Sequence, residues 1–359
     1  MTNVQIDPAV DTTRRQWLQA LAAAPLVASA TAPKSAKAAI KTSARIVIAG
    51  SGLGGIAVAN RLTQLLDGGK ITIIDRKEEH NYQPGYTLVA SGVWPVSKVR
   101  DRNADFLPAG IEWVKDMVAH FDPVANTVVT ASGQRIPYDF LVVATGVHLD
   151  YAQITGMDVS AIGREGLTSV YPSPEAAQAT WAAMQTFTAR GGNAVMTLPA
   201  TPLKCAGAPL KMTFMLRDRL AKAGTLGASK IHFESALGNV FGVKVVNDNV
   251  LQRWQGLGID VDFSRKLTAI DIGARRATFA LSEGETKEMS YDFIHVVPPT
   301  RAPDAVKNSE LAWKEGPFAT GGWLEVDKST LQHRRFPNVF GIGDINGTPR
   351  GKTAATVKK

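Results

Sequence analysis

The chain has a single cysteine, and its surroundings are those of a reactive thiol rather than of a core residue. Cys205 follows an apolar stretch that predicts a strand, and it lies in PLKCAGAP at the expected start of a helix. Beside Lys204 and near Lys211, the thiol is expected to ionise more readily than a free cysteine does. A thiolate is the form that attacks sulfur compounds. The sequence therefore predicts a reactive, nucleophilic thiol at Cys205, and an inert buried cysteine is the alternative.

A glycine-rich turn is the second stretch with chemical capacity. A predicted strand, Arg45 to Ala49, leads into GSGLGG, an apolar-faced helix and a second strand that ends on Asp75. In dinucleotide-binding folds such glycines allow a tight turn, a close approach of the pyrophosphate and packing of the helix on the strand. The helix N-terminus favours the negative charge. This order predicts a dinucleotide site rather than a chance glycine loop, with Asp75 accepting hydrogen bonds from ribose hydroxyls.

The segments after Asp75 are expected to complete the first domain. In residues 78–92, Pro84 and Gly85 should interrupt any helix. Gln83 and Tyr86 are polar contacts for the cofactor unless the segment is an ordinary surface loop. Residues 111–129 alternate apolar and polar side chains around a turn and predict an antiparallel excursion. Residues 136–146 predict one buried strand of the parallel sheet, ended by Thr145 and Gly146.

A second α/β unit is expected from about residue 147. Residues 174–187 predict a helix and residues 193–199 a buried strand. The Cys205 segment stands where a second glycine fingerprint would follow this strand, which argues against a nicotinamide cofactor. We therefore expect an α/β fold with two Rossmann-like dinucleotide-binding domains, the second lacking the NAD fingerprint. Residues 43–150 and 298–359 should form the first domain, and residues 151–297 the second.

The C-terminal part is expected to close the cofactor site. Residues 336–342 predict a strand, and Gly343 and Asp344 follow at its carboxyl end, where ligands bind in open α/β sheets. Asp344 is expected to hydrogen-bond the cofactor, and a simple helix cap is the alternative. Lys352, at a predicted helix start, is expected to stabilise negative charge on the reduced cofactor.

Residues 1–40 have the character of a targeting segment. Arg14 and Arg15 precede an apolar run, residues 18–32, that is too short to span a bilayer, and small residues follow it. This pattern predicts a twin-arginine export signal and a periplasmic protein, and a disordered or helical extension is the alternative. Elsewhere no apolar run is long enough to predict a transmembrane helix.

Composition excludes some classes of protein and leaves others open. The formal net charge is +8, but the basic residues are scattered and no nucleic-acid-binding motif accompanies them, so we exclude a nucleic-acid partner. A basic face toward anionic lipid or an acidic partner stays open. None of the six histidines has the spacing of a metal site, so no metal is expected.

The segments GSGLGG, HNYQPGYTLVASG, PLKCAGAPLK, FIHVVPP and LEVDKSTLQHRRFPNVFGIGD resemble the sulfide:quinone oxidoreductase family, most of all its mitochondrial-type branch. Flavocytochrome c sulfide dehydrogenase is a relative. The resemblance implies a glutathione-reductase-like fold that binds FAD, with Cys205 as one of two redox cysteines. The candidate FAD contacts are Gly50, Gly52, Leu53, Gly54, Gly55, Asp75, Gln83, Val118, Thr145, Gly146, Gly343 and Asp344, and the candidate catalytic residues are Cys205 and Lys352.

The sequence departs from the family pattern at two places. The family's second cysteine follows the Gly-Asp pair directly, but Ile345 stands there in this chain. Cys205 would then hold its sulfur as a persulfide that an outside acceptor removes. The chain also stops soon after Lys352, where the family continues into a segment that closes the quinone pocket and lies on the membrane. We therefore expect either a truncated chain or a member with different electron delivery.

The expected function is FAD-dependent oxidation of sulfide at Cys205, with a quinone as the electron acceptor and peripheral contact with the membrane. One alternative keeps the sulfur chemistry but delivers the electrons to a cytochrome c partner. Another is a redox-silent, flavin-binding sulfur carrier. An NADH:quinone reductase is disfavoured by the missing second set of glycines.

Overall fold

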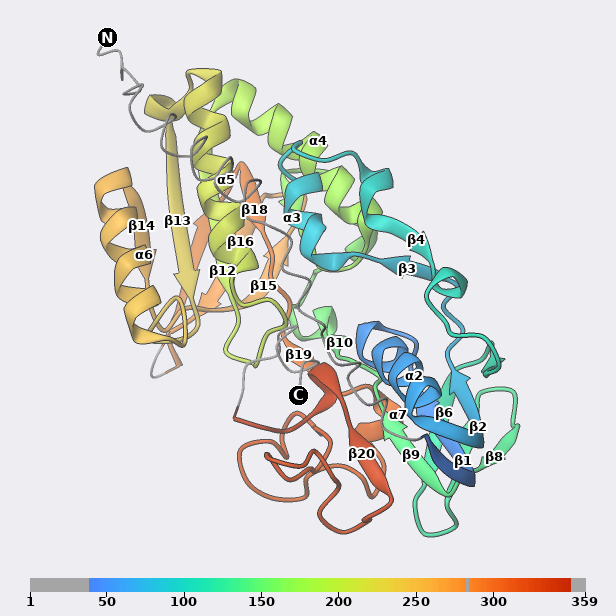
Figure 1. The fold of residues 1–359 in the computed structure, drawn as a ribbon. Coiled ribbons are helices and arrows are strands. Elements are labelled where there is room, and N and C mark those ends of the chain that lie inside the picture. Colours follow the sequence, from blue (N-terminus) through green and yellow to red (C-terminus); the bar gives the residue numbers. More distant parts are fainter. Residues whose placement is uncertain (1–38, 282–283, 350–359) are drawn as a thin grey trace, which may run out of the picture. The chain divides into compact units, whose positions relative to one another are not determined.

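The computed structural model describes residues 39–281 and 284–349 (Figure 1). A five-stranded parallel sheet is the centre of its first part. In spatial order its strands are β20 (Val339–Gly341), β9 (Phe140–Val143), β1 (Ile40–Ala49), β2 (Leu66–Ile74) and β5 (Glu112–Val114). Successive residues of β1 face different cores: Val47 and Ala49 pack in one hydrophobic cluster, Ile46 and Ile48 in another. The sheet is therefore covered on both faces, as parallel sheets are.

The predicted strand, glycine turn, helix and second strand are confirmed. β1 begins at Ile40, before the expected Arg45, and pairs in parallel with β2. Between them lies helix α2 (Leu53–Leu65), whose N-cap is Gly52. Gly50 has φ +108°, a conformation that L side chains rarely adopt, so the tight turn requires a glycine there.

Two strand predictions after Asp75 are wrong in detail. β5, within residues 111–129, joins the parallel sheet beside β2; the antiparallel sheet consists of β6 (Val118–Asp122), β7 (Thr127–Thr130) and β8 (Arg135–Pro137). Residues 136–146 are likewise not one strand, since β8 ends at Pro137 and β9 starts at Phe140. Between them Asp139 bonds to Arg45 at the start of the buried part of β1. The chain changes sheets at this point, which an apolar run does not reveal.

The expectation that Pro84 and Gly85 interrupt any helix is also wrong. A 3₁₀ turn, η1 (Gln83–Gly85), leads directly into the short helix α3 (Tyr86–Val89). Pro84 lies in the first turn, where its missing N–H has no intrahelical partner to lose. Strands β3 (Glu79–Asn81) and β4 (Arg100–Arg102) pair on either side of this segment.

A second parallel sheet forms the α/β unit that contains Cys205. In spatial order its strands are β11 (Leu167–Thr168), β18 (Phe293–His295), β12 (Gly192–Leu198), β13 (Ser229–Ser235) and β14 (Ile259–Asp262). Its helices, shown in Figure 1, are α4 (Pro174–Arg190), α5 (Ala208–Ala223) and α6 (Lys244–Leu257). The Ser173 hydroxyl accepts the Ala176 N–H at the start of α4, and Pro174 follows at the first helical position, so the predicted helix has the expected N-terminal signals.

Smaller elements connect and cover the two sheets. Strands β15 (Lys266–Asp271), β16 (Arg276–Ala280) and β17 (Thr286–Ser290) form an antiparallel sheet whose apolar residues share a core with the second parallel sheet. β10 (His148–Leu149) pairs with β19 (Thr300–Arg301), where the chain leaves the first part and returns, and helix α7 (Asp304–Lys307) follows. The fold class is as expected, and the domain boundaries themselves stay a prediction.

Candidate functional site

The glycine turn has the geometry of a pyrophosphate cradle. A Cβ on Gly55 would collide with the Gly50 carbonyl oxygen, and a Cβ on Gly50 would come within 2.5 Å of the Ala144 oxygen. Around Gly52, in contrast, there is open space, and no side chain caps α2. The free N–H groups and positive dipole end of such a helix bind anions. Two of the glycines are thus needed for packing, and Gly52 leaves room for a ligand.

Asp75 lies at the carboxyl end of β2, beside this turn. Its carboxylate accepts the Ser51 N–H at 2.8 Å and the Lys77 N–H at 2.9 Å. The side chain is half-buried, and an ionised carboxylate has about four acceptor positions, so it can still accept bonds from sugar hydroxyls. Strand β5 lies beside Asp75, because the Asp75 N–H donates to the carbonyl of Val114, the last residue of β5, at 3.1 Å. Val118 begins β6 four residues further along the chain.

A hydrogen-bond network that the sequence analysis missed holds the turn in place. Asn103 is buried, and its amide donates to the Ser51 hydroxyl at 2.7 Å and to the Lys77 carbonyl. The His80 ring nitrogen Nδ1 lies 3.0 Å from the Asn103 side-chain oxygen. These residues lie in the glycine turn, in or before β3 and in a 3₁₀ turn far along the chain, so no local sequence signal connects them. An asparagine in a 3₁₀ turn reads as an ordinary turn residue.

The ends of β9 and β20 complete the cradle. Thr145 and Gly146 follow β9, and the buried Thr145 hydroxyl has no hydrogen-bond partner within residues 39–281 and 284–349. After β20, a Cβ on Gly54 would contact the Ile342 side chain at 3.3 Å, so the helix start and the β20 end are adjacent. An uncapped helix, open space at Gly52 and an unpartnered Thr145 hydroxyl together fit the binding of FAD.

Cys205 lies in a tight turn before α5 rather than in the helix. It is two residues before the N-cap, Gly207, and its carbonyl accepts the Ala208 N–H at 2.8 Å. The sequence analysis expected the Cys205 thiol at the start of a helix, and the structure places it in the turn just before that helix. Its φ is +53°, unusual for a residue with a side chain, and such conformations often accompany functional sites. The preceding residues are anchored, because the Thr300 N–H donates to the Thr201 hydroxyl at 2.9 Å.

Lys204 connects the thiol turn to the predicted cofactor residues. Its ammonium donates to the Gln83 side-chain oxygen at 2.6 Å and interacts electrostatically with Asp344 and Cys205. Burial lowers the pKa of Lys204 to about 8, against the opposing pull of the Asp344 carboxylate. The structure therefore brings together Gln83, Asp344 and the cysteine turn, from three distant stretches of sequence.

Some predicted features are not part of this assembly. Ile345, in place of a second cysteine, is fully buried in the core of the first sheet. Lys352 and residues 1–38, with the Arg14–Arg15 pair, lie outside the described residues. Among the residues that the structure describes, no cluster of His, Cys, Asp and Glu could hold a metal ion, and no helix is long and apolar enough to cross a bilayer.

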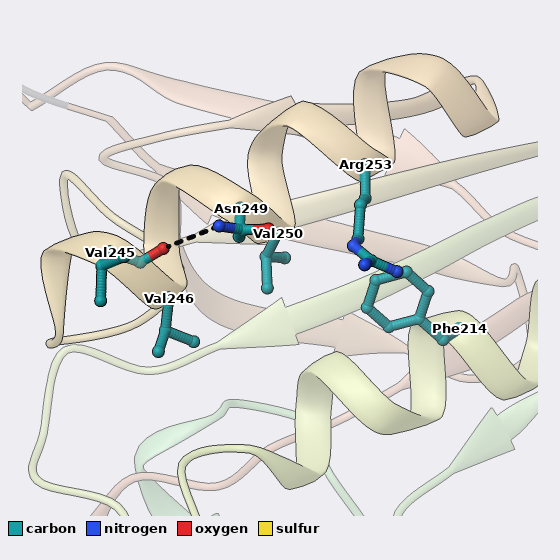
Figure 2. A pocket seen from close by; sticks show the side chains of 6 residues that line it. All are labelled: Phe214, Val245, Val246, Asn249, Val250 and Arg253. Carbon is teal, nitrogen blue, oxygen red and sulfur yellow. Dashed lines mark hydrogen bonds between the residues drawn. The ribbon is translucent and has the colours of Figure 1, made fainter. Parts of the chain in front are cut away.

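A surface hollow lies elsewhere, between α5 and α6, and it contains none of the predicted site residues. The hollow has a volume of about 490 Å³. Figure 2 shows the side chains that line it. The lining residues are Phe214, Val245, Val246, Asn249, Val250 and Arg253. Val245 is 67% exposed, and the neighbouring Val243 is 53% exposed. This face is thus apolar at the start of α6, with an arginine further along the helix.

Comparisons with known proteins agree with this architecture. Residues 44–187 match the family model of the pyridine nucleotide-disulphide oxidoreductases. The chain is 36% identical over 314 residues to the mitochondrial sulfide:quinone oxidoreductase of Mus musculus, a match that covers 87% of this chain and 68% of the relative. It is also 36% identical over 320 residues to the mitochondrial sulfide:quinone oxidoreductase of Dictyostelium discoideum, covering 89% of this chain and 69% of that one.

A solved structure is similar over most of the chain as well. The sulfide:quinone oxidoreductase of Aquifex aeolicus superposes with a TM-score of 0.71 at 25% identity, covering 87% of this chain and 70% of that chain. The expectation of a periplasmic, exported protein is wrong by these comparisons. Three of the matched relatives, at 31% to 36% identity, are mitochondrial enzymes. An arginine pair before a short apolar run is too common a pattern to decide a compartment.

Proposed function

Because this chain belongs to the sulfide:quinone oxidoreductase family, we propose that it is an FAD-dependent enzyme that oxidises sulfide at Cys205 and passes two electrons to a quinone. The observation that carries this proposal is the position of Lys204. Its ammonium bonds to Gln83 and interacts with both Asp344 and Cys205. A nucleophilic sulfur is thus held beside residues of the predicted FAD site.

The reaction at Cys205 begins with its thiolate and a hydrosulfide ion. A sulfur–sulfur bond forms between them, one proton is released, and two electrons leave, so that Cys205 becomes a persulfide. Bound FAD would supply the acceptor for these two electrons, and a quinone would then take them up. The protein supplies the cradle at Gly50 to Gly55 for the pyrophosphate, the Asp75 carboxylate for sugar hydroxyls and, near the sulfur, the Lys204 ammonium.

The single cysteine determines how the sulfur must leave. Ile345 cannot form a bridge with Cys205, so the persulfide is opened by an external nucleophile such as a thiol or sulfite. The acceptor attacks the outer sulfur and forms a bond to it, while the bond to Cys205 breaks and restores the thiolate. This transfer needs no further oxidant, because the two electrons have already left.

Stopped-flow absorbance on the FAD-loaded protein tests the proposal. Sulfide should bleach the oxidised flavin, and the variant Cys205→Ser should bleach far more slowly. Oxidised flavin that persists at millimolar sulfide, or equal bleaching by the Ser variant, would contradict the mechanism. Decylubiquinone and cytochrome c, compared as oxidants of the reduced protein, distinguish a quinone acceptor from a protein acceptor.

The missing second cysteine favours one alternative, a sulfur carrier without turnover. In that case mass spectrometry after sulfide exposure would find a stable persulfide on Cys205, while quinone reduction stays absent. Quinone reduction coupled to sulfide loss would exclude this alternative.

A quinone acceptor implies contact with a membrane, and we propose peripheral attachment to anionic lipid. The net charge of +8 favours a negatively charged surface. At the start of α6, exposed Val243 and Val245 flank the exposed Lys244, whose ammonium lies 2.6 Å from the Asp248 carboxylate. Apolar and basic side chains together are the combination that binds a helix to a lipid interface. Val246 lies beside them, at the edge of the hollow in Figure 2.

A further inference from the structure

We propose that the hollow between α5 and α6 binds an acyl chain of an anionic phospholipid, whose phosphate is held by Arg253. This inference rests on the peripheral membrane attachment proposed above, and it names the lipid and the groups that bind it. None of the residues that line the hollow belongs to the predicted FAD site or to the cysteine turn, so the site is separate from the reaction.

The first observation is an apolar hollow that continues into an exposed apolar surface. Its volume of about 490 Å³ lies within the range of about 300–1,000 Å³ that small-molecule sites have. Phe214, Val246 and Val250 line it, and at the start of α6 it reaches Val245, which is 67% exposed. An acyl chain can therefore contact apolar side chains from the protein surface into the hollow.

The second observation is a guanidinium group without a partner at the other end of the hollow. Arg253 lies eight residues after Val245, about 12 Å along the helix axis, and Figure 2 shows the two residues at opposite ends of the lining. Within residues 39–281 and 284–349, Arg253 makes no hydrogen bond or ion pair. A guanidinium matches the geometry of a phosphate group. An apolar wall that ends at a cation is complementary to a molecule with an apolar chain and an anionic head.

The third observation is a second hollow on the far side of Arg253. It has a volume of about 610 Å³ and adjoins the first, because Phe214, Asn249 and Arg253 line both. The polar Gln252 lines only the second hollow. Arg253 thus lies between an apolar space for the chain and a more polar space for the headgroup.

The end of α6 borders the second hollow and would by itself repel an anion, because the C-terminus of a helix carries partial negative charge. The Arg217 side chain offsets this effect. Its Nε donates to the Leu257 carbonyl at 3.1 Å, and Leu257 lines the second hollow. In the part of the chain that the structure describes, Arg217 has no carboxylate partner.

The acidic residues of α5 and α6 do not neutralise these arginines. Asp218 lies 2.7 Å from the Lys222 ammonium, and Asp248 lies 2.6 Å from the Lys244 ammonium. The positive charge near the two hollows is therefore available to an anionic headgroup.

Isothermal titration calorimetry on the FAD-loaded protein tests this inference with soluble lipids below the concentration at which they form micelles. Dihexanoylphosphatidylglycerol should bind about tenfold more tightly than dihexanoylphosphatidylcholine, whose ammonium offsets the phosphate charge, and more tightly than glycerol phosphate, which has no acyl chain. Absence of binding by the anionic lipid would overturn the proposal. Equal binding of the two lipids would do the same, and equally tight binding of glycerol phosphate would indicate a site for free phosphate instead.

Two variants separate the headgroup contact from the chain contact. Arg253→Gln should weaken binding of the anionic lipid about tenfold, to the level of the zwitterionic lipid. Val246→Asn places an amide in the apolar lining and should weaken binding of both lipids by the same factor. Arg135→Gln, which removes an exposed arginine of β8, is the control and should leave both affinities unchanged. An equal loss in Arg135→Gln would mean that only net charge matters, and the inference would be wrong.

The measurement also distinguishes a second copy of this chain as the occupant of the hollow. In that case the protein would form a dimer in analytical ultracentrifugation, Val246→Asn would dissociate it, and the anionic lipid would not bind; this result would refute the proposal. Lipid binding is measured without sulfide or quinone, and both variants should keep normal flavin bleaching. Normal bleaching without lipid binding would therefore refute this inference alone, whereas lipid binding without bleaching would refute only the proposed reaction.

Discussion

At the scale of single residues, the site depends on one ammonium group in an unusual setting. Lys204 is half-buried, and desolvation lowers its pKa to about 8, while Asp344 and Cys205 nearby favour its charge. A cation of this kind next to a thiolate stabilises the nucleophile and attracts hydrosulfide. Because its pKa lies close to neutral pH, the charge is lost within a range where the enzyme can be assayed.

Lys204→Met should slow flavin reduction by sulfide about tenfold at pH 7, since one unit charge near the sulfur is lost. The ratio of wild-type to variant rate should fall toward one above pH 9, because the wild-type ammonium deprotonates as pH rises through about 8. Stopped-flow absorbance from pH 6 to 10 measures this ratio. Lys222→Met, which removes an exposed ammonium paired with Asp218, is the control and should leave the rate unchanged. A ratio independent of pH would contradict this role for Lys204.

At the scale of elements, two acidic side chains, one just after β2 and one near the end of β13, have different surroundings. After β2, Asp75 is half-buried and bonded to the glycine turn. Near the end of β13, Glu234 is 1% exposed, and neither carboxylate oxygen has a partner in the described chain. Burial, with Asp262 adding to it, raises the pKa of Glu234 to about 7. Glu234 is thus buried in the core of the second unit, whereas Asp75 in the first unit lies at the edge of the sheet where a ligand is expected to bind.

The free energy of unfolding should reflect this buried acid. The folded pKa of Glu234, about 7, lies above the unfolded value of 4.5, so the folded state holds the proton more tightly. Its contribution to stability is complete below pH 4.5 and is lost as pH rises through about 7, a loss on the order of 3 kcal/mol. Glu234→Gln should therefore be more stable than wild type at pH 8 and nearly equal at pH 4.5. Urea denaturation of both proteins at the two pH values measures this. A variant less stable at pH 8 would contradict it.

At the scale of the whole molecule, excess positive charge and the apolar start of α6 should act together at a lipid surface. The protein should float with vesicles containing anionic lipid and should not float with purely zwitterionic vesicles. High salt should weaken this binding by screening. Val245→Asp adds a negative charge on the exposed α6 face and should reduce flotation severalfold without altering flavin bleaching by sulfide. Val124, which lies in the β6–β7 turn and is 80% exposed against 67% for Val245, gives the control variant Val124→Asp. Equal flotation of Val245→Asp and wild type would exclude α6 as the lipid contact.

Much of the cofactor cradle could be predicted from sequence because its parts are local. The turn at Gly50, the close packing at Gly55 and the acid after β2 all follow from the backbone of one strand–helix–strand unit, and glycine is the residue that such a backbone requires. The helical periodicity of residues 174–187 and the continuous apolar run at residues 193–199 likewise predicted a helix and a buried strand, since burial of one face or of both selects apolar residues at the corresponding positions.

What only the tertiary structure decided is which distant residues meet. The contact of Lys204 with Gln83 and the bond from Asn103 to Ser51 each join segments whose separation along the chain conveys nothing about distance in space. The switch from β8 to β9 was also hidden, because a run of this composition can form either one long strand or two short strands in different sheets. By itself the sequence determined the nucleotide-binding fold and a lone thiol; packing decided which charged groups lie near this thiol.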